Sequence, residues 1–183
     1  MTALPRNVWL LTISQSLIMS VSSMVVFVGG LIGTKIAPVE KLATLPIACM
    51  VIGTATAVVP VTFIMKTIGR KKSFLLILTY SIVISFLCAY AIYLQAFYFF
   101  CVCTFLFGAT NACVMQFRFA AMESVAPELI PNAASSVLLG GIAAAFIGPE
   151  AAVFGKDLFS TEFLGSFLLL ALQIGRASCR ERV

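Results

Sequence analysis

Two otherwise apolar stretches of the sequence carry polar side chains at helical spacing. In the first stretch, the residues at spacings of three and four are Thr12, Gln15, Met19, Ser22 and Ser23. In the second stretch they are Gly108, Asn111, Met115 and Arg118. An unpaired polar group in hydrocarbon is costly, so each stripe is expected to face protein or water. Such stripes can contact a solute or join helices by hydrogen bonds. The amides of Gln15 and Asn111 favour the first reading, and the hydroxyls favour the second.

Charged residues close to these stretches are few. Arg118 stands near the end of its stretch, where it can reach the interface or pair with Glu123. Pairing or gating therefore fits Arg118 better than direct substrate binding. Glu150 is the sole acidic residue that adjoins the uncharged core of a stretch, which makes it the candidate for proton coupling. The alternative for Glu150 is a solvated carboxylate at a helix end.

The sequence has no histidine and no catalytic constellation. It lacks a Ser/His/Asp set, a pair of intramembrane aspartates, a phosphate-binding loop and a metal-ligand cluster. The apolar stretches contain Cys49, Cys88, Cys101, Cys103 and Cys113. Cysteines in that setting fit small packing residues better than disulfides or a metal site. We expect no enzyme activity, no cofactor and no metal, because an intramembrane enzyme would need reactive residues that are absent here.

The elements that must position these residues are membrane-spanning helices. Of the 183 residues, 61% are hydrophobic and 10% are charged, which is too much apolar surface for a soluble domain of this size. A span needs about 20 apolar residues, and the uncharged stretches are 7–34, 42–65, 73–117 and 129–149. Their continuous rather than alternating apolar character favours helices over barrel strands. We predict an all-α polytopic bundle with helices at 8–32, 45–65, 73–94, 97–121 and 133–154, and a sixth that begins near Glu162.

The basic residues divide unequally between alternate connections of this bundle. One side has Arg6, Lys66, Arg70, Lys71, Lys72 and Arg118. The other side has Lys35, Lys41 and Lys156. An excess of Lys and Arg marks the cytoplasmic side, so we expect a multi-pass protein of the cytoplasmic (inner) membrane with its N-terminus in the cytoplasm. Because these residues set topology beside spans, the expected partner is the lipid bilayer and not nucleic acid.

The connection between the second and third helices reads "FIMKTIGRKKSF". Glycine permits a tight reversal, and the cations that follow hold the loop at an anionic membrane surface. A Gly-Arg-Lys turn between these two helices resembles the signature loop of the major facilitator superfamily, G-x-L-x-D-R-x-G-R-[RK]. Gly69, Arg70 and Lys71 match its second half. Thr62 replaces the leading Gly and Lys66 replaces the Asp, so the charge pairing of that Asp does not carry over.

The fifth helix, "SSVLLGGIAAAFIGPEAA", also resembles that superfamily, in which glycines lead to a Gly-Pro pair, here Gly148 and Pro149. Small residues recur every fourth position at Ser136, Gly140, Ala144 and Gly148. Such a stripe lets another helix backbone approach closely, either for ordinary packing or for bending and gating at Gly148 and Pro149.

The connection before the fifth helix completes the resemblance. Residues that loosely match the family pattern there are Pro127, Glu128, Asn132, Ala133 and Ser135. Ile130 replaces the usual basic residue. The resemblance covers residues 7 to about 173, and the order and spacing of its motifs are more specific than any one of them.

The resemblance implies one six-helix half of a twelve-helix secondary transporter that moves a small solute by alternating access. In that fold the first and fourth helices line the central cavity, so the candidates for substrate contact are Gln15, Met19, Ser22, Asn111 and Met115. The candidates for gating and the cytoplasmic loop are Gly69, Arg70, Lys71, Arg118, Gly148 and Pro149. Glu150 is the candidate for coupling to H⁺ or another ion. The native partner would be a missing C-terminal half, without which we expect no transport. A small non-transporting membrane scaffold is the alternative.

The chain ends with "IGRASCRERV", which has four charged residues among ten. Before it, only residues 163–173 remain for the sixth span, about half the hydrocarbon thickness at about 1.5 Å per residue. Back-translated, residues 174–183 resemble a widely used sequencing adapter. We therefore expect residues 1–173 to be an incomplete N-terminal transmembrane domain and residues 174–183 to be non-native, with a genuine basic tail as the alternative.

Overall fold

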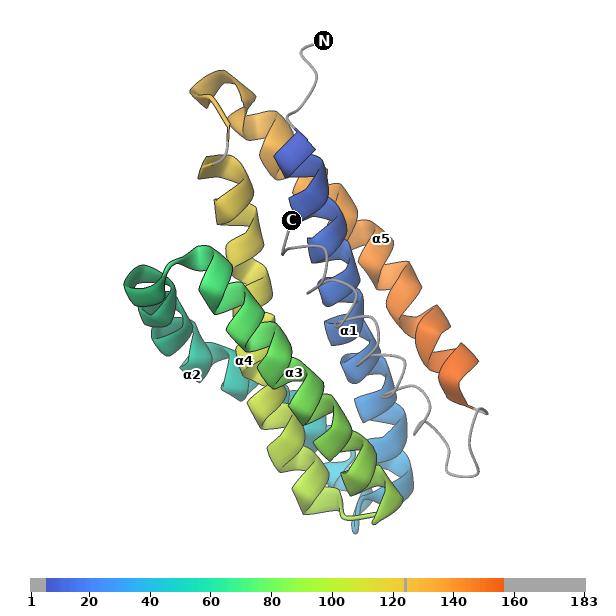
Figure 1. Ribbon diagram of the computed structural model, residues 1–183. Helices are drawn as coiled ribbons and strands as arrows, with labels where there is room; N and C mark the ends of the chain where they lie inside the picture. Colours follow the sequence, from blue (N-terminus) through green and yellow to red (C-terminus); the bar gives the residue numbers. More distant parts are fainter. Residues whose placement is uncertain (1–5, 124, 157–183) are drawn as a thin grey trace.

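A computed structural model describes residues 6–123 and 125–156 (Figure 1). Five long helices account for most of this part of the chain: α1 (Arg6–Ile36), α2 (Leu45–Ile68), α3 (Arg70–Tyr93), α4 (Phe97–Glu123) and α5 (Ile130–Lys156). Two single-turn 3₁₀ helices, η1 (Glu40–Leu42) and η2 (Pro127–Leu129), lie in the connections.

The predicted all-α polytopic bundle is confirmed. Each of the five predicted helices is present, with ends within four residues of the observed ones. All five are long and apolar enough to cross a membrane. A helix satisfies every backbone hydrogen bond within its own segment, which is what a chain in hydrocarbon requires. The predicted sixth span and the tail at 174–183 lie outside the described residues.

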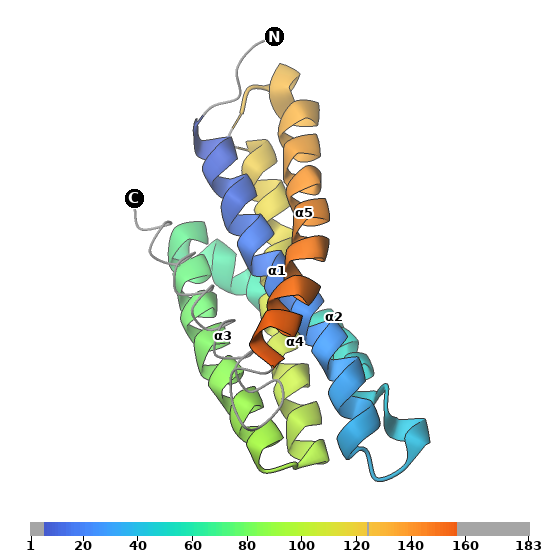
Figure 2. The same cartoon turned by 90° about the vertical axis from the view of Figure 1, so that its right-hand side faces the viewer.

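Successive helices run in opposite directions, so their connections gather at two ends of the bundle. The start of α1 and the α4–α5 connection lie at the top in Figures 1 and 2, and the α2–α3 turn lies at the upper ends of its own two helices, lower in the view. The other two connections, with η1 and the short α3–α4 turn, lie at the lower end. This arrangement brings the connections predicted to be cytoplasmic to the same end.

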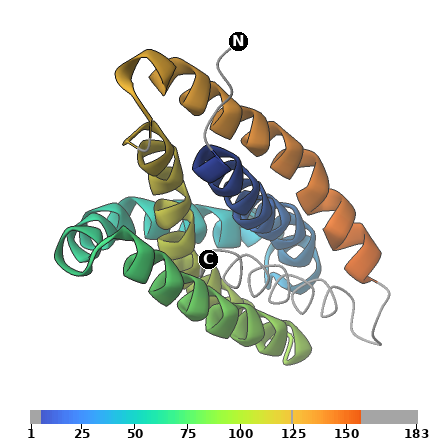
Figure 3. The same cartoon turned by 45° about the horizontal axis from the view of Figure 1, so that its top comes forward.

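The helices pack mainly in two pairs, α1 along α5 and α2 along α4, and α3 packs against α4. Figure 3 shows α1 between α5 and α4. Glycines allow the pairs to approach closely. A Cβ atom added at Gly53 of α2 would clash with the backbone of Phe105 on α4, and one at Gly108 would clash with the backbone of Gly53. Backbone contact at this crossing therefore requires both residues to lack a side chain.

The predicted small-residue stripe of α5 packs against α1. Gly140 and Gly148 are buried, and Ala144 is fully inaccessible. A Cβ atom at Gly148 would lie 2.6 Å from the carbonyl oxygen of Ser20 and 3.0 Å from the backbone nitrogen of Met24. Close approach of a second backbone is therefore the observed use of this stripe, as small residues at membrane helix interfaces permit.

Several buried hydroxyls are satisfied within helices or between them. Ser20 and Ser85 donate to carbonyls of their own helices, at 2.7 Å in both cases. Ser81 of α3 shares a hydrogen bond with Thr110 of α4. Large apolar side chains are exposed on the outer faces of α2 and α5, and the most exposed are Val59, Phe146 and Phe154. An apolar outside around a hydrogen-bonded inside is what a bilayer favours.

Candidate functional site

A cavity of about 500 Å³ lies between α1, α4 and α5. Its lining residues are Gln15, Met19, Val114, Met115, Phe119, Leu138, Gly141, Ile142 and Ala145. Ligand pockets for small molecules usually measure about 300–1,000 Å³ and have mainly apolar walls with a few polar groups. The cavity has both properties, because among the described residues that line it Gln15 is the one polar side chain.

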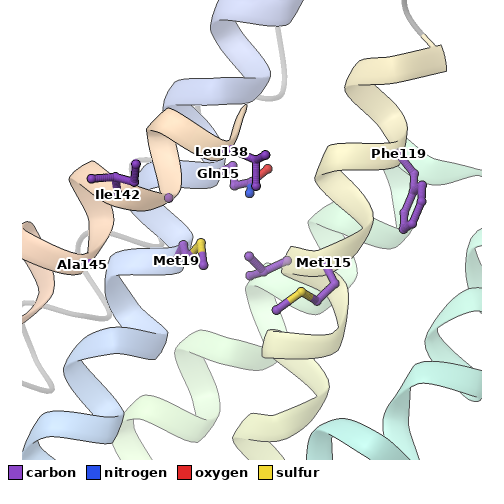
Figure 4. A pocket seen from close by; sticks show the side chains of 9 residues that line it. Gln15, Met19, Met115, Phe119, Leu138, Ile142 and Ala145 are labelled. Carbon is purple, nitrogen blue, oxygen red and sulfur yellow. The ribbon is translucent and has the colours of Figure 1, made fainter. Parts of the chain in front are cut away.

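Three of the five predicted substrate-contact residues meet in this cavity. Gln15 and Met19 are one helical turn apart on α1, so they project from the same face. Met115 faces them from α4 across the gap (Figure 4). Gln15 lies nine residues after Arg6, and Met115 lies eight residues before Glu123. At about 1.5 Å per residue, the cavity lies roughly 12–14 Å from the upper end of these helices.

The other two predicted contact residues, Asn111 and Ser22, do not line the cavity. Asn111 Nδ2 donates to Thr54 Oγ1 of α2 at 3.2 Å, which is a hydrogen bond between helices. Five residues further along α4, Gln116 Nε2 donates to Thr62 Oγ1 at 3.3 Å. Asn111 and Gln116 of α4 therefore face α2. Ser22 is buried, and its hydroxyl has no hydrogen-bond partner in the described part of the chain.

The contribution of α5 to the cavity was not among the features predicted from the sequence. Leu138, Gly141, Ile142 and Ala145 form one wall of the cavity. These residues repeat at intervals of three and four, so they share one helix face. That periodicity was the available signal, but apolar residues of a membrane helix can equally face lipid.

The α2–α3 connection is a one-residue turn at Gly69, whose φ of 84° lies in the region that glycine tolerates best. The turn places the first residue of α3 beside the last residue of α4. Arg70 Nη2 lies 2.6 Å from Glu123 Oε1, so Glu123 pairs with Arg70. The expected pairing of Glu123 with Arg118 stays a prediction. The side chains of Lys71 and Arg118 lie outside what the structure describes.

The remaining predicted residues lie lower on α5. Gly148 is buried against α1, and Pro149 continues the helix. Glu150 is exposed and does not line the cavity. Gly148 therefore belongs to the α1–α5 contact, below the cavity wall that the same helix provides.

Fold and cavity together define a polytopic membrane protein of the helix-bundle class with a ligand-sized space between three spans. The chain is similar to the riboflavin transporter RfnT of Brucella anthropi, with 33% identity over 172 residues. The similarity covers 93% of this chain and 43% of the relative, so the chain spans less than half of the relative's length. No protein-family model matches the chain. No solved structure matches it either. The similarity supports a role in transport.

Proposed function

We propose that this chain forms the N-terminal half of a secondary transporter that carries a small, riboflavin-like solute across the cytoplasmic membrane. The observation that carries the proposal is the similarity to a riboflavin transporter over 93% of the chain, and therefore over most of the segment that builds the cavity. The chain would supply one wall of the substrate site, and a second half would supply the other.

The chemistry of the cavity supports a solute with a flat, largely apolar ring system. Two thioethers and an aromatic ring line the cavity, from Met19, Met115 and Phe119. Methionine sulfur packs favourably against aromatic rings and adapts to their shape. A flavin ring would fit such walls, and its polar edge would need few hydrogen-bonding groups.

The open side of the cavity supports a site completed by another part of the protein. Met115 and Phe119 on α4 are each 49% exposed, and Ile142 on α5 is 58% exposed. In a carrier of the major facilitator type, a second six-helix half would cover these side chains. Rocking of the two halves about the site would open it to each side of the membrane in turn.

The Arg70–Glu123 pair and the Gly69 turn join the start of α3 to the end of α4. We propose that they fix the α2–α3 turn against α4 while the halves move. Gly148 and Pro149 would let α5 bend against α1 during the same motion.

Uptake of labelled riboflavin into proteoliposomes tests the proposal. The 183-residue chain is reconstituted in one preparation and the product of the complete gene in another, with protein-free vesicles as the control. We expect uptake with the complete product alone. Absence of uptake by the complete product overturns the transport proposal. Uptake by the 183-residue chain above the control overturns the division of the site between two halves.

A further inference from the structure

The carboxamide of Gln15 is a buried polar group whose oxygen accepts no hydrogen bond from the described residues. The side chain is 6% exposed, and its Oε1 atom has no hydrogen-bond partner in the described part of the chain. The buried Ser22 hydroxyl of α1 also lacks a partner among the described residues, whereas two hydroxyls closer to Gln15 are satisfied. Ser16 donates to the carbonyl of Thr12 at 2.8 Å, and Ser20 donates to that of Leu17 at 2.7 Å. A buried acceptor left without a donor costs stability, so the protein retains Gln15 at a thermodynamic cost.

The unsatisfied group stands at the wall of the cavity. Figure 4 shows the Gln15 head group directed from α1 into the space that separates it from α4. Met19 lies one turn below on the same helix, and Met115 lies opposite. A small rotation about the last side-chain torsion, which is a soft one, turns the amide plane toward that space. A bound solute can therefore supply the missing donor.

An amide side chain has a donor and an acceptor side by side in one plane. Its complement is a ring edge on which an N–H group adjoins a carbonyl group, as in a lactam or a cyclic imide. The two parallel hydrogen bonds would fix the ring in the plane of the amide. The thioethers of Met19 and Met115 would then pack against the ring faces.

We propose that Gln15 is the specificity-determining residue of the cavity and recognises the N–H and carbonyl edge of a planar heteroaromatic solute. Gln15 Oε1 accepts a hydrogen bond from the ring N–H, and Nε2 donates one to the adjacent ring carbonyl. The proposal rests on the proposed function and adds to it the chemical group by which the solute is selected. Riboflavin has such an edge at N3, between two carbonyl groups.

The test compares riboflavin with 3-methylriboflavin, in which a methyl group replaces the N3 hydrogen. Quenching of flavin fluorescence measures binding to the product of the complete gene, the parent chain of this experiment, in lipid nanodiscs. Variant Gln15→Met removes both polar atoms at similar volume, and Ser16→Ala is the matched control. Ser16 is the next residue on the helix, its hydroxyl bonds within α1, and it does not line the cavity.

We expect riboflavin to bind the parent chain roughly two- to tenfold more tightly than 3-methylriboflavin, the range that one net hydrogen bond supplies. Gln15→Met abolishes this preference, and Ser16→Ala retains it. Gln15→Met also unfolds at a higher denaturant concentration than the parent chain, because it removes an unsatisfied buried group.

The outcomes separate the two proposals. Binding of both flavins with equal affinity by the parent chain and by Gln15→Met overturns the role of Gln15 and leaves the proposed function standing. The comparison of two flavins on the parent chain needs no variant, so it holds even if Gln15→Met fails to fold. Absence of binding of either flavin to the parent chain overturns the riboflavin-like substrate, and the role of Gln15 falls with it.

Discussion

Replacement of Gly148 by alanine should loosen the contact between α5 and α1. The new Cβ atom would lie 2.6 Å from the Ser20 carbonyl oxygen and 2.8 Å from the Ser23 Cβ atom. An ordinary contact begins at 3.4 Å, so the helices would have to separate locally by about 0.8 Å. The obstructing oxygen and the backbone nitrogen of Met24 belong to the main chain of α1, and neither can move aside alone.

Gly141→Ala on the same helix is the matched control. Its Cβ atom would lie 3.2 Å from Met19 Sδ, at the end of a flexible side chain that can move by a few tenths of an ångström. Both variants gain about 1 kcal/mol of helix propensity over glycine, and this term cancels in the comparison. Overpacking costs typically about 1–3 kcal/mol, so Gly148→Ala should be less stable than Gly141→Ala by about that amount.

Unfolding of the 183-residue chain by SDS in mixed micelles, followed by circular dichroism, gives the free energy of unfolding of each variant. The prediction is wrong if the free energies of unfolding of the two variants differ by less than about 0.5 kcal/mol. Such a result would show that the α1 backbone at Ser20 moves aside as easily as the Met19 side chain does. A larger loss in Gly141→Ala would refute the prediction as well.

Three further predictions concern the ends and the α2–α4 contact of the bundle. Gly69→Ala should destabilise the chain by about 1–2 kcal/mol in the same SDS titration, because the φ of 84° disfavours a Cβ atom; an unchanged midpoint would contradict this. Arg70→Glu should lower the free energy of unfolding by at most about 1 kcal/mol, because the side chains of Arg70 and Glu123 are 39% and 65% exposed. Adding Glu123→Arg should restore stability at low salt, and failure of this double variant to recover would argue against the ion pair. Asn111→Leu should cost about 0.6 kcal/mol through the lost bond to Thr54 and leave riboflavin affinity unchanged; a tenfold weaker affinity would instead place Asn111 in the substrate site.

Much of the candidate site could be anticipated from helical spacing. Gln15, Met19 and Met115 share stripes that the sequence displays, and the structure brings all three to one cavity. The wall from α5 could not be anticipated in the same way, because Leu138 and Ile142 are as apolar as residues that face lipid. The hydrogen bond from Asn111 to Thr54 depends on where α2 and α4 cross, and that crossing depends on Gly53 and Gly108 meeting in space.

The sequence by itself determined the helical class, the approximate limits of the five helices, their alternating direction and the small-residue stripe of α5. These features follow from local properties, namely the length of apolar segments, the position of turns and the periodicity of small residues. Only the tertiary arrangement shows which faces enclose the cavity, that Arg70 pairs with Glu123, and that the Gln15 oxygen has no partner among the described residues. The physical reason is that hydrophobicity distinguishes membrane from water but not lipid from a neighbouring helix, so contacts within the bundle depend on shape and hydrogen bonding between distant segments.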